Sequence, residues 1–208
     1  MKRFSLIYSA LLILSALVLS PVFAAEEEVR ILFLGDSLTA GLGVEPHEAY
    51  PSVIRDMLDE KQLTHITLTN GGISGSTTAS AVSRLKWFLR TPPQVLFLAL
   101  GANDGLRGLS LDEMAKNLDN TILLAKENRI RVILAGMEIP PNYGPEYTRA
   151  FREVFGALAR KHDLAFMPFL LKDVAGNPSL NQADGIHPNA EGHRIIAAHV
   201  LPYILENP

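Results

Sequence analysis

Four short runs of apolar, partly β-branched residues recur along this chain, and a glycine follows each run within three residues. They span residues 29–34, 66–68, 95–100 and 130–135. Apolar runs of this length bounded by turn residues predict buried strands. Strands that are apolar on both faces are typical of a parallel sheet covered by helices on both sides. The chain is therefore expected to build its core around a buried parallel sheet.

Segments with helical spacing lie between and after these runs. In the clearest of them, residues 111–125, apolar side chains recur on one face, and Ser110 with Glu113 three residues later forms the pattern of a capping box. The other expected helices span residues 51–62, 78–89, 146–161 and 190–205. This alternation predicts an α/β fold, a three-layer α/β/α sandwich with a mainly parallel central sheet.

Length and composition favour one packed domain. A chain of 208 residues, 48% of them hydrophobic and 20% charged, is long enough for a sizeable core and short for two typical domains. The absence of cysteine excludes disulfides, a thiolate nucleophile and cysteine-ligated zinc. The formal net charge of -3 gives no broad electrostatic attraction for nucleic acid, so no nucleic-acid partner is expected.

The N-terminal segment has the three parts of a secretory signal peptide. Lys2 and Arg3 precede an apolar stretch from residue 4 to residue 19, and Pro21 and small residues follow it. We expect cleavage after Ala24, which leaves residues 25–208 as the folded domain in the periplasm or secreted, without stable membrane insertion. The alternative is an uncleaved membrane anchor, although the apolar stretch is shorter than the about 20 residues that a spanning helix prefers.

Two of the loops that follow predicted strands carry groups suited to acyl chemistry. Ser37 comes directly after the first strand, where a serine can present its hydroxyl at the sheet edge, although Asp36 or Ser37 can also be simply a helix N-cap. Asn103 follows the third strand beside glycines, as either a turn residue or a side-chain amide donor. Each signal is weak alone.

Two further loops complete the set. The glycines around Gly75 make turns, or they let backbone amides approach a developing oxyanion. Asp184 lies three residues before His187, a spacing that suits either a structural turn or a carboxylate that orients an imidazole. Because the carboxyl ends of parallel strands meet at one edge of a sheet, the four loops together predict a serine nucleophile with an Asp-His pair.

The blocks around these residues resemble those of the SGNH hydrolases, also called GDSL-type esterases, and the similarity covers the whole chain after residue 24. The residues that carry it are Gly35-Asp36-Ser37-Leu38, Gly75, Gly101-Ala102-Asn103-Asp104 and Asp184-Gly185-Ile186-His187-Pro188. Within that superfamily the chain is most similar to bacterial periplasmic arylesterases, acyl-CoA thioesterases and lysophospholipases.

The resemblance implies a flavodoxin-like fold, and a function in cleaving acyl esters and thioesters through an acyl-enzyme on Ser37. It implies a catalytic triad of Ser37, His187 and Asp184, and an oxyanion hole formed by Ser37, Gly75 and Asn103. It also implies a mobile loop over residues 104–110 beside the acyl pocket. The residues expected to contact substrate are Asp104, Gly105, Leu106, Leu109, Ile139, Pro140 and Tyr143.

Other readings of the sequence remain open. His187, Glu191 and His193 are close together, but their spacing is not that of a His-Glu-x-x-His zinc site, and we expect Glu191 and His193 on the exposed start of a helix. No metal or cofactor is expected, and a monomer is the simplest state. The rival functions are removal of acetyl groups from polysaccharide and non-catalytic lipid binding on the same scaffold.

Overall fold

The computed structural model describes residues 27–207, so the expected signal peptide lies outside the described residues. Five strands form one parallel sheet in the order β2-β1-β3-β4-β5. They are β1 (Val29–Gly35), β2 (Ile66–Asn70), β3 (Val95–Ala99), β4 (Arg131–Ala135) and β5 (Ala165–Met167). The sequence pattern does not predict β5, because three residues at the edge of a sheet are too few to show a periodic pattern.

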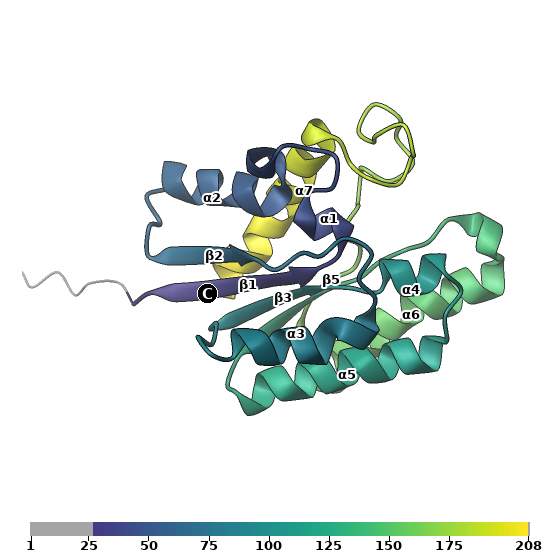
Figure 1. The fold of residues 1–208 in the computed structure, drawn as a ribbon, viewed down its shortest axis with the longest axis horizontal. Helices are drawn as coiled ribbons and strands as arrows, with labels where there is room; N and C mark the ends of the chain where they lie inside the picture. The colour runs from purple at the N-terminus through teal and green to yellow at the C-terminus, as the bar shows by residue number, and fades with distance from the viewer. Residues whose placement is uncertain (1–26, 208) are drawn as a thin grey trace, which may run out of the picture.

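Helices cover both faces of the sheet, which confirms the three-layer sandwich (Figure 1). On one face lie α2 (Tyr50–Glu60) and α7 (Ala190–Glu206), and on the other lie α3 (Ala81–Phe88), α5 (Leu111–Glu127) and α6 (Pro145–His162). The predicted helix over residues 78–89 begins with the 3-10 turn η2 (Thr78–Ser80). The Ser110 hydroxyl caps α5 by accepting a hydrogen bond from the Glu113 N–H at 3.3 Å.

The centre of the sheet is fully buried. Every residue of β3 is buried, and Phe97 in β3 pairs in register with Phe33 in β1, their ring centroids 5.2 Å apart. From α2, the ring of Tyr50 packs edge-on against Phe33 at 5.7 Å. This packing fixes the two central strands, and with them the loops at their carboxyl ends. Within residues 27–207, no helix has the length and apolar character needed to cross a membrane.

The order of the strands reverses direction between β1 and β3. In doubly wound sheets such a reversal opens a crevice beyond the carboxyl ends of the two strands. The short helices α1 (Ser37–Ala40) and α4 (Ala102–Leu106) begin there, directly after β1 and β3, and the 3-10 turns η1 (Pro46–Glu48) and η3 (Pro141–Tyr143) complete the elements. The loops with the chemically suited residues therefore gather at this edge, on the right in Figure 1.

Candidate active site

The structure brings Ser37, His187 and Asp184 into one hydrogen-bonded line. The His187 Nε2 atom lies 2.9 Å from the Ser37 hydroxyl, 150 positions away in the sequence. The His187 Nδ1 atom lies 2.7 Å from the Asp184 carboxylate. This is the arrangement in which an imidazole takes a proton from a serine while a carboxylate orients the ring.

The start of α1 presents the Ser37 hydroxyl. Asp36 is the N-cap of this helix, and its Oδ1 atom accepts a hydrogen bond from the Leu38 N–H at 3.0 Å. The helix ends after one turn at Gly41, whose φ of 77° is the left-handed conformation that glycine adopts without strain. Asp36 thus carries the capping role, which leaves the side chain of Ser37 free to face His187.

A tight turn holds Asp184 in place under His187. Its Oδ1 atom accepts hydrogen bonds at 3.0 Å from the backbone N–H groups of both Ile186 and His187. The backbone bond from His187, the bond to its ring and the Ile186 N–H together lower the pKa of Asp184 to about 2. The Asp184 carboxylate therefore stays ionised across the neutral range and accepts a hydrogen bond from the His187 Nδ1–H. The proton stays on Nδ1, so that Nε2 is the nitrogen that can accept a proton.

The carboxyl group of Asp36 is fully buried beside the nucleophile. Burial raises its pKa to about 6, against the lowering effect of hydrogen bonds from the Leu38 N–H and the Asn103 side chain and of the nearby His187. Ionising the Asp36 carboxyl group therefore costs more free energy in the folded protein than in the unfolded chain.

We expect this cost to appear as a pH dependence of stability. Between pH 3.8 and about 6 the folded protein keeps the Asp36 proton that the unfolded chain has lost, so the free energy of unfolding should fall as pH rises through this window. The pKa shift of Asp36 corresponds to a change of about 3 kcal/mol in the free energy of unfolding. Urea denaturation of the wild type and of Asp36→Asn at pH 4 and pH 7 measures it, because the substitution removes this contribution. Identical pH dependences in the two proteins would contradict the burial effect.

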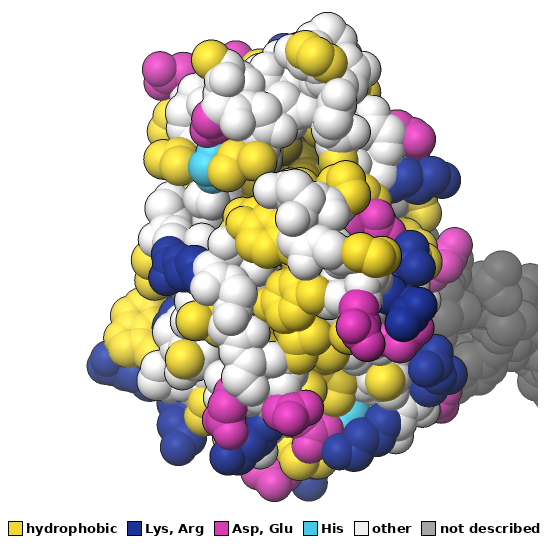
Figure 2. All heavy atoms as spheres, turned by 90° about the vertical axis from the view of Figure 1, so that its right-hand side faces the viewer, with side chains coloured by type: hydrophobic (Ala, Val, Ile, Leu, Met, Phe, Trp, Pro, Cys, Tyr) yellow, Lys and Arg dark blue, Asp and Glu magenta, His cyan; other side chains and the backbone are white. Residues whose placement is uncertain are grey.

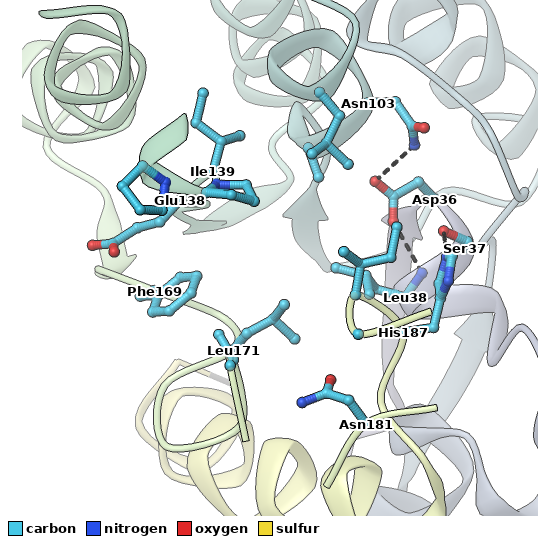
Figure 3. A pocket seen from close by; sticks show the side chains of 18 residues that line it. Asp36, Ser37, Leu38, Asn103, Glu138, Ile139, Phe169, Leu171, Asn181 and His187 are labelled. Carbon is cyan, nitrogen blue, oxygen red and sulfur yellow. Dashed lines mark hydrogen bonds between the residues drawn. The ribbon is translucent and has the colours of Figure 1, made fainter. Parts of the chain in front are cut away.

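The residues expected to form the oxyanion hole meet at the same edge. The Asn103 side chain lies in α4 and donates a hydrogen bond from Nδ2 to the Asp36 carboxylate at 3.3 Å (Figure 3). Gly75, in the loop after β2, has a φ of 77°. Both residues contact Arg107, whose guanidinium donates to the Gly75 carbonyl at 3.0 Å and to the Asn103 Oδ1 at 3.4 Å. The sequence alone assigns Arg107 no role.

A largely apolar cavity of about 490 Å³ opens beside Ser37 and His187. Figure 2 faces this edge of the molecule and shows hydrophobic side chains gathered in a hollow across it. Of the expected substrate contacts, Leu106, Ile139 and Pro140 line the cavity. Phe169 and Leu171, which follow β5, form part of its wall (Figure 3). The sequence did not indicate these two residues, because the short strand before them carries no recognisable pattern.

The other expected substrate contacts do not line this cavity. Asp104 is buried, and its carboxylate accepts hydrogen bonds from the Thr78 N–H at 2.9 Å and the Thr78 hydroxyl at 2.6 Å, so it ties α4 to the start of η2. Gly105 faces the core, where an added Cβ would lie 2.6 Å from the Phe151 ring. The side chains of Leu109 and Tyr143 are exposed at the surface. Part of the expected loop over residues 104–110 is instead helical, in α4.

His193 does not lie on an exposed helix start, as the sequence analysis expected. It is 1% exposed, stacks on the Tyr50 ring at 6.3 Å and accepts a hydrogen bond from the Tyr50 N–H. Burial lowers its pKa to about 4, so it is neutral at neutral pH. The helix turn that exposes Glu191 points His193 into the core. Among residues 27–207, no group of three or more His, Asp or Glu side chains is placed to hold a metal ion.

The chain is similar to known hydrolases over most of its length. Residues 33–195 match the model of the GDSL-like Lipase/Acylhydrolase family. An arylesterase of Vibrio mimicus is 35% identical over 185 residues, which are 88% of this chain and 92% of that protein. The thioesterase 1/protease 1/lysophospholipase L1 of Escherichia coli K12 is 32% identical over 176 residues, 84% of this chain and 83% of that protein.

A solved structure supports the same assignment. The psychrotrophic esterase EstA from Pseudoalteromonas sp., in a structure inhibited by monoethylphosphonate, superposes with a TM-score of 0.82 at 33% sequence identity, covering 86% of this chain and 98% of that one. Together with the matched residues 33–195 and the site built at the edge of the sheet, these similarities show that the chain belongs to the GDSL-like lipase/acylhydrolase family.

Proposed function

We propose that this protein is a serine hydrolase that cleaves carboxylic acyl esters and thioesters through an acyl-enzyme on Ser37. The observation that carries the proposal is the hydrogen-bonded line from Asp184 through His187 to Ser37, which ends beside an apolar cavity. A hydroxyl activated in this way attacks a carbonyl, and the cavity offers a place for the apolar part of an acyl substrate.

The reaction follows from this geometry in two halves. His187 Nε2 takes the Ser37 proton as the hydroxyl oxygen bonds to the acyl carbon, and the carbonyl oxygen becomes an oxyanion. The Ser37 N–H, the Gly75 N–H and the Asn103 side chain donate hydrogen bonds to that oxyanion. The tetrahedral intermediate then collapses, and the leaving alkoxide or thiolate receives the proton from His187. Water, deprotonated by the same histidine, attacks the acyl-enzyme, which releases the acid and returns the proton to Ser37.

The cavity and the relatives support a range of acyl substrates. The lining by Leu106, Ile139 and Phe169 suits an acyl chain or an aromatic ring, and the similar proteins are named for arylesterase, thioesterase and lysophospholipase activities. We infer that aryl esters, acyl-CoA and lysophospholipids are substrates of the same site, with no cofactor required. We further propose that residues 1–24 direct a monomeric enzyme to the periplasm or the medium.

Filling the cavity is expected to change the preference for acyl-chain length. Leu106→Trp places a larger side chain in the cavity wall, so kcat/KM for a p-nitrophenyl decanoate should fall at least about tenfold relative to the acetate. The matched control is Leu109→Trp, the same change at an exposed residue outside the cavity, which should leave the ratio unchanged. An equal ratio in both variants would show that long chains bind elsewhere.

The test of the proposed function is covalent labelling. A fluorophosphonate probe should label the wild-type protein, because an activated serine attacks phosphorus as it attacks an acyl carbon, and Ser37→Ala should not be labelled. Absence of labelling and of ester turnover in the folded wild type would support the non-catalytic lipid-binding alternative. Turnover of acetylated sugars, with none of longer acyl esters or thioesters, would instead indicate a carbohydrate esterase.

A further inference from the structure

The Arg107 side chain bridges two loops that each carry one proposed oxyanion donor. Its Nη2 atom donates to the carbonyl oxygen of Gly75, in the loop after β2, at 3.0 Å. The same nitrogen lies 3.4 Å from the Asn103 Oδ1, in α4 after β3. Arg107 itself follows the last turn of α4 and is exposed, so burial in the core does not explain its contacts.

The Asn103 carboxamide is held from two sides. Its oxygen faces the Arg107 guanidinium, and its nitrogen donates to the Asp36 carboxylate at 3.3 Å. A cation on one side and a carboxylate on the other favour one of the two amide orientations, because the reverse orientation would place like partners together. Since an amide nitrogen has two hydrogens, one bonds Asp36 and the second stays available for an oxyanion. Figure 3 shows the Asn103 amide directed toward Asp36.

Gly75, unlike Asn103, has no side chain through which its position could be fixed. It lies in an exposed loop. Among residues 27–207, apart from Gly75 and its two chain neighbours, Arg107 Nη2 alone comes within 4 Å of the position that a Cβ on Gly75 would occupy, at 3.5 Å. A backbone N–H in such a loop stabilises a developing charge efficiently only if its direction is fixed before the reaction. The bond from Arg107 to the Gly75 carbonyl supplies a fixed point next to that N–H.

We propose that Arg107 is a positioning residue that couples the Gly75 and Asn103 oxyanion donors into one preorganised unit. The inference rests on the proposed function and goes beyond it, because it assigns a role to a side chain outside the triad and the oxyanion hole. Arg107 acts through the two donors and does not need to touch the substrate. Its loss therefore affects transition-state stabilisation, which lowers kcat, and leaves ground-state binding of a neutral ester nearly unchanged.

The first arm of the test measures Arg107→Ala on p-nitrophenyl acetate, a neutral ester. We expect kcat to fall at least about tenfold, less than the loss of a whole donor, with KM unchanged within about twofold. Arg90→Ala, another exposed arginine far from the site, is the matched control and should behave as the wild type. Unchanged kcat in Arg107→Ala would overturn the proposal. A rise in KM confined to acyl-CoA would overturn it too, because Arg107 would then bind the anionic leaving group.

The second arm is a double-mutant cycle with Asn103→Ala. If Arg107 acts partly through Asn103, Arg107→Ala should lower kcat less in the Asn103→Ala background than in the wild type. The two fold-changes in kcat should differ by more than about threefold, which exceeds the scatter between independent sites. Equal fold-losses in both backgrounds would overturn the proposal. Arg107→Gln repeats the cycle if thermal melting shows that Arg107→Ala is unfolded. Labelling and turnover by the wild type separate failure of this inference from failure of the proposed function.

Discussion

Replacing His187 by alanine is expected to lower kcat for ester hydrolysis by about four to six orders of magnitude. The imidazole is the only titratable ring within hydrogen-bond distance of the Ser37 hydroxyl among the described residues, with Nε2 at 2.9 Å. Without it, the serine must lose its proton to water while it attacks, and the leaving group must depart without an acid. Formation and hydrolysis of the acyl-enzyme therefore both lose the group that transfers the proton.

The measurement is single-turnover and steady-state kinetics on a p-nitrophenyl ester, with thermal melting to show that the variant is folded. His47→Ala is the matched control, because it removes an exposed imidazole from the 3-10 turn η1 and should leave kcat unchanged. A His187→Ala protein that kept its activity within tenfold of the wild type would remove His187 from the reaction. The Ser37 assignment would then rest on labelling alone.

Replacing Asn103 by alanine is expected to lower kcat about 10²- to 10³-fold while changing KM little. The triad stays intact in this variant, so the attack on the carbonyl still occurs. The developing negative charge, however, loses one preorganised donor, whose amide nitrogen is oriented by Asp36, the residue next to the nucleophile. The loss is therefore smaller than that expected for His187→Ala.

The same esterase assay checks this prediction. Asn128→Ala is the control. The Asn128 side-chain amide also donates a hydrogen bond, in this case to the Leu124 carbonyl near the end of α5, but it lies on the surface away from the cavity. Full turnover in Asn103→Ala would mean that the backbone donors of Ser37 and Gly75 carry the oxyanion by themselves. The proposed coupling of Asn103 and Gly75 through Arg107 would then be contradicted, because Asn103 would not act as a donor.

Local sequence patterns were enough to predict the layers of this fold. Apolar runs such as residues 95–100 identify buried strands because each face of such a strand needs cover, and the amphipathic spacing of residues 111–125 identifies the helix that supplies it. The edge strand β5 was not predicted, because Ala165–Met167 is short and only partly buried and its few side chains show no periodic pattern.

The sequence also indicated Ser37, Asp184 and His187, although each was ambiguous alone. Asp36 is indeed an N-cap, as one reading of that loop held, and this role is compatible with a reactive serine at the next position. A parallel sheet resolves the ambiguity, because it gathers the carboxyl ends of its strands at one edge and so brings loops from distant positions together. The inference from four weak signals to one site rests on that geometry.

Tertiary structure decided which neighbouring side chains face the cavity and which face the core. Asp104 is adjacent to Asn103 in sequence, yet one turn of α4 directs it to Thr78, whereas Asn103 meets Asp36. Arg107 gains one of its two partners, Gly75, from a loop 32 positions away, which no local pattern records. The chain order and residue types therefore determined the fold class and the reacting groups. The direction of each side chain depended on packing between distant segments, because burial is a property of the assembled layers.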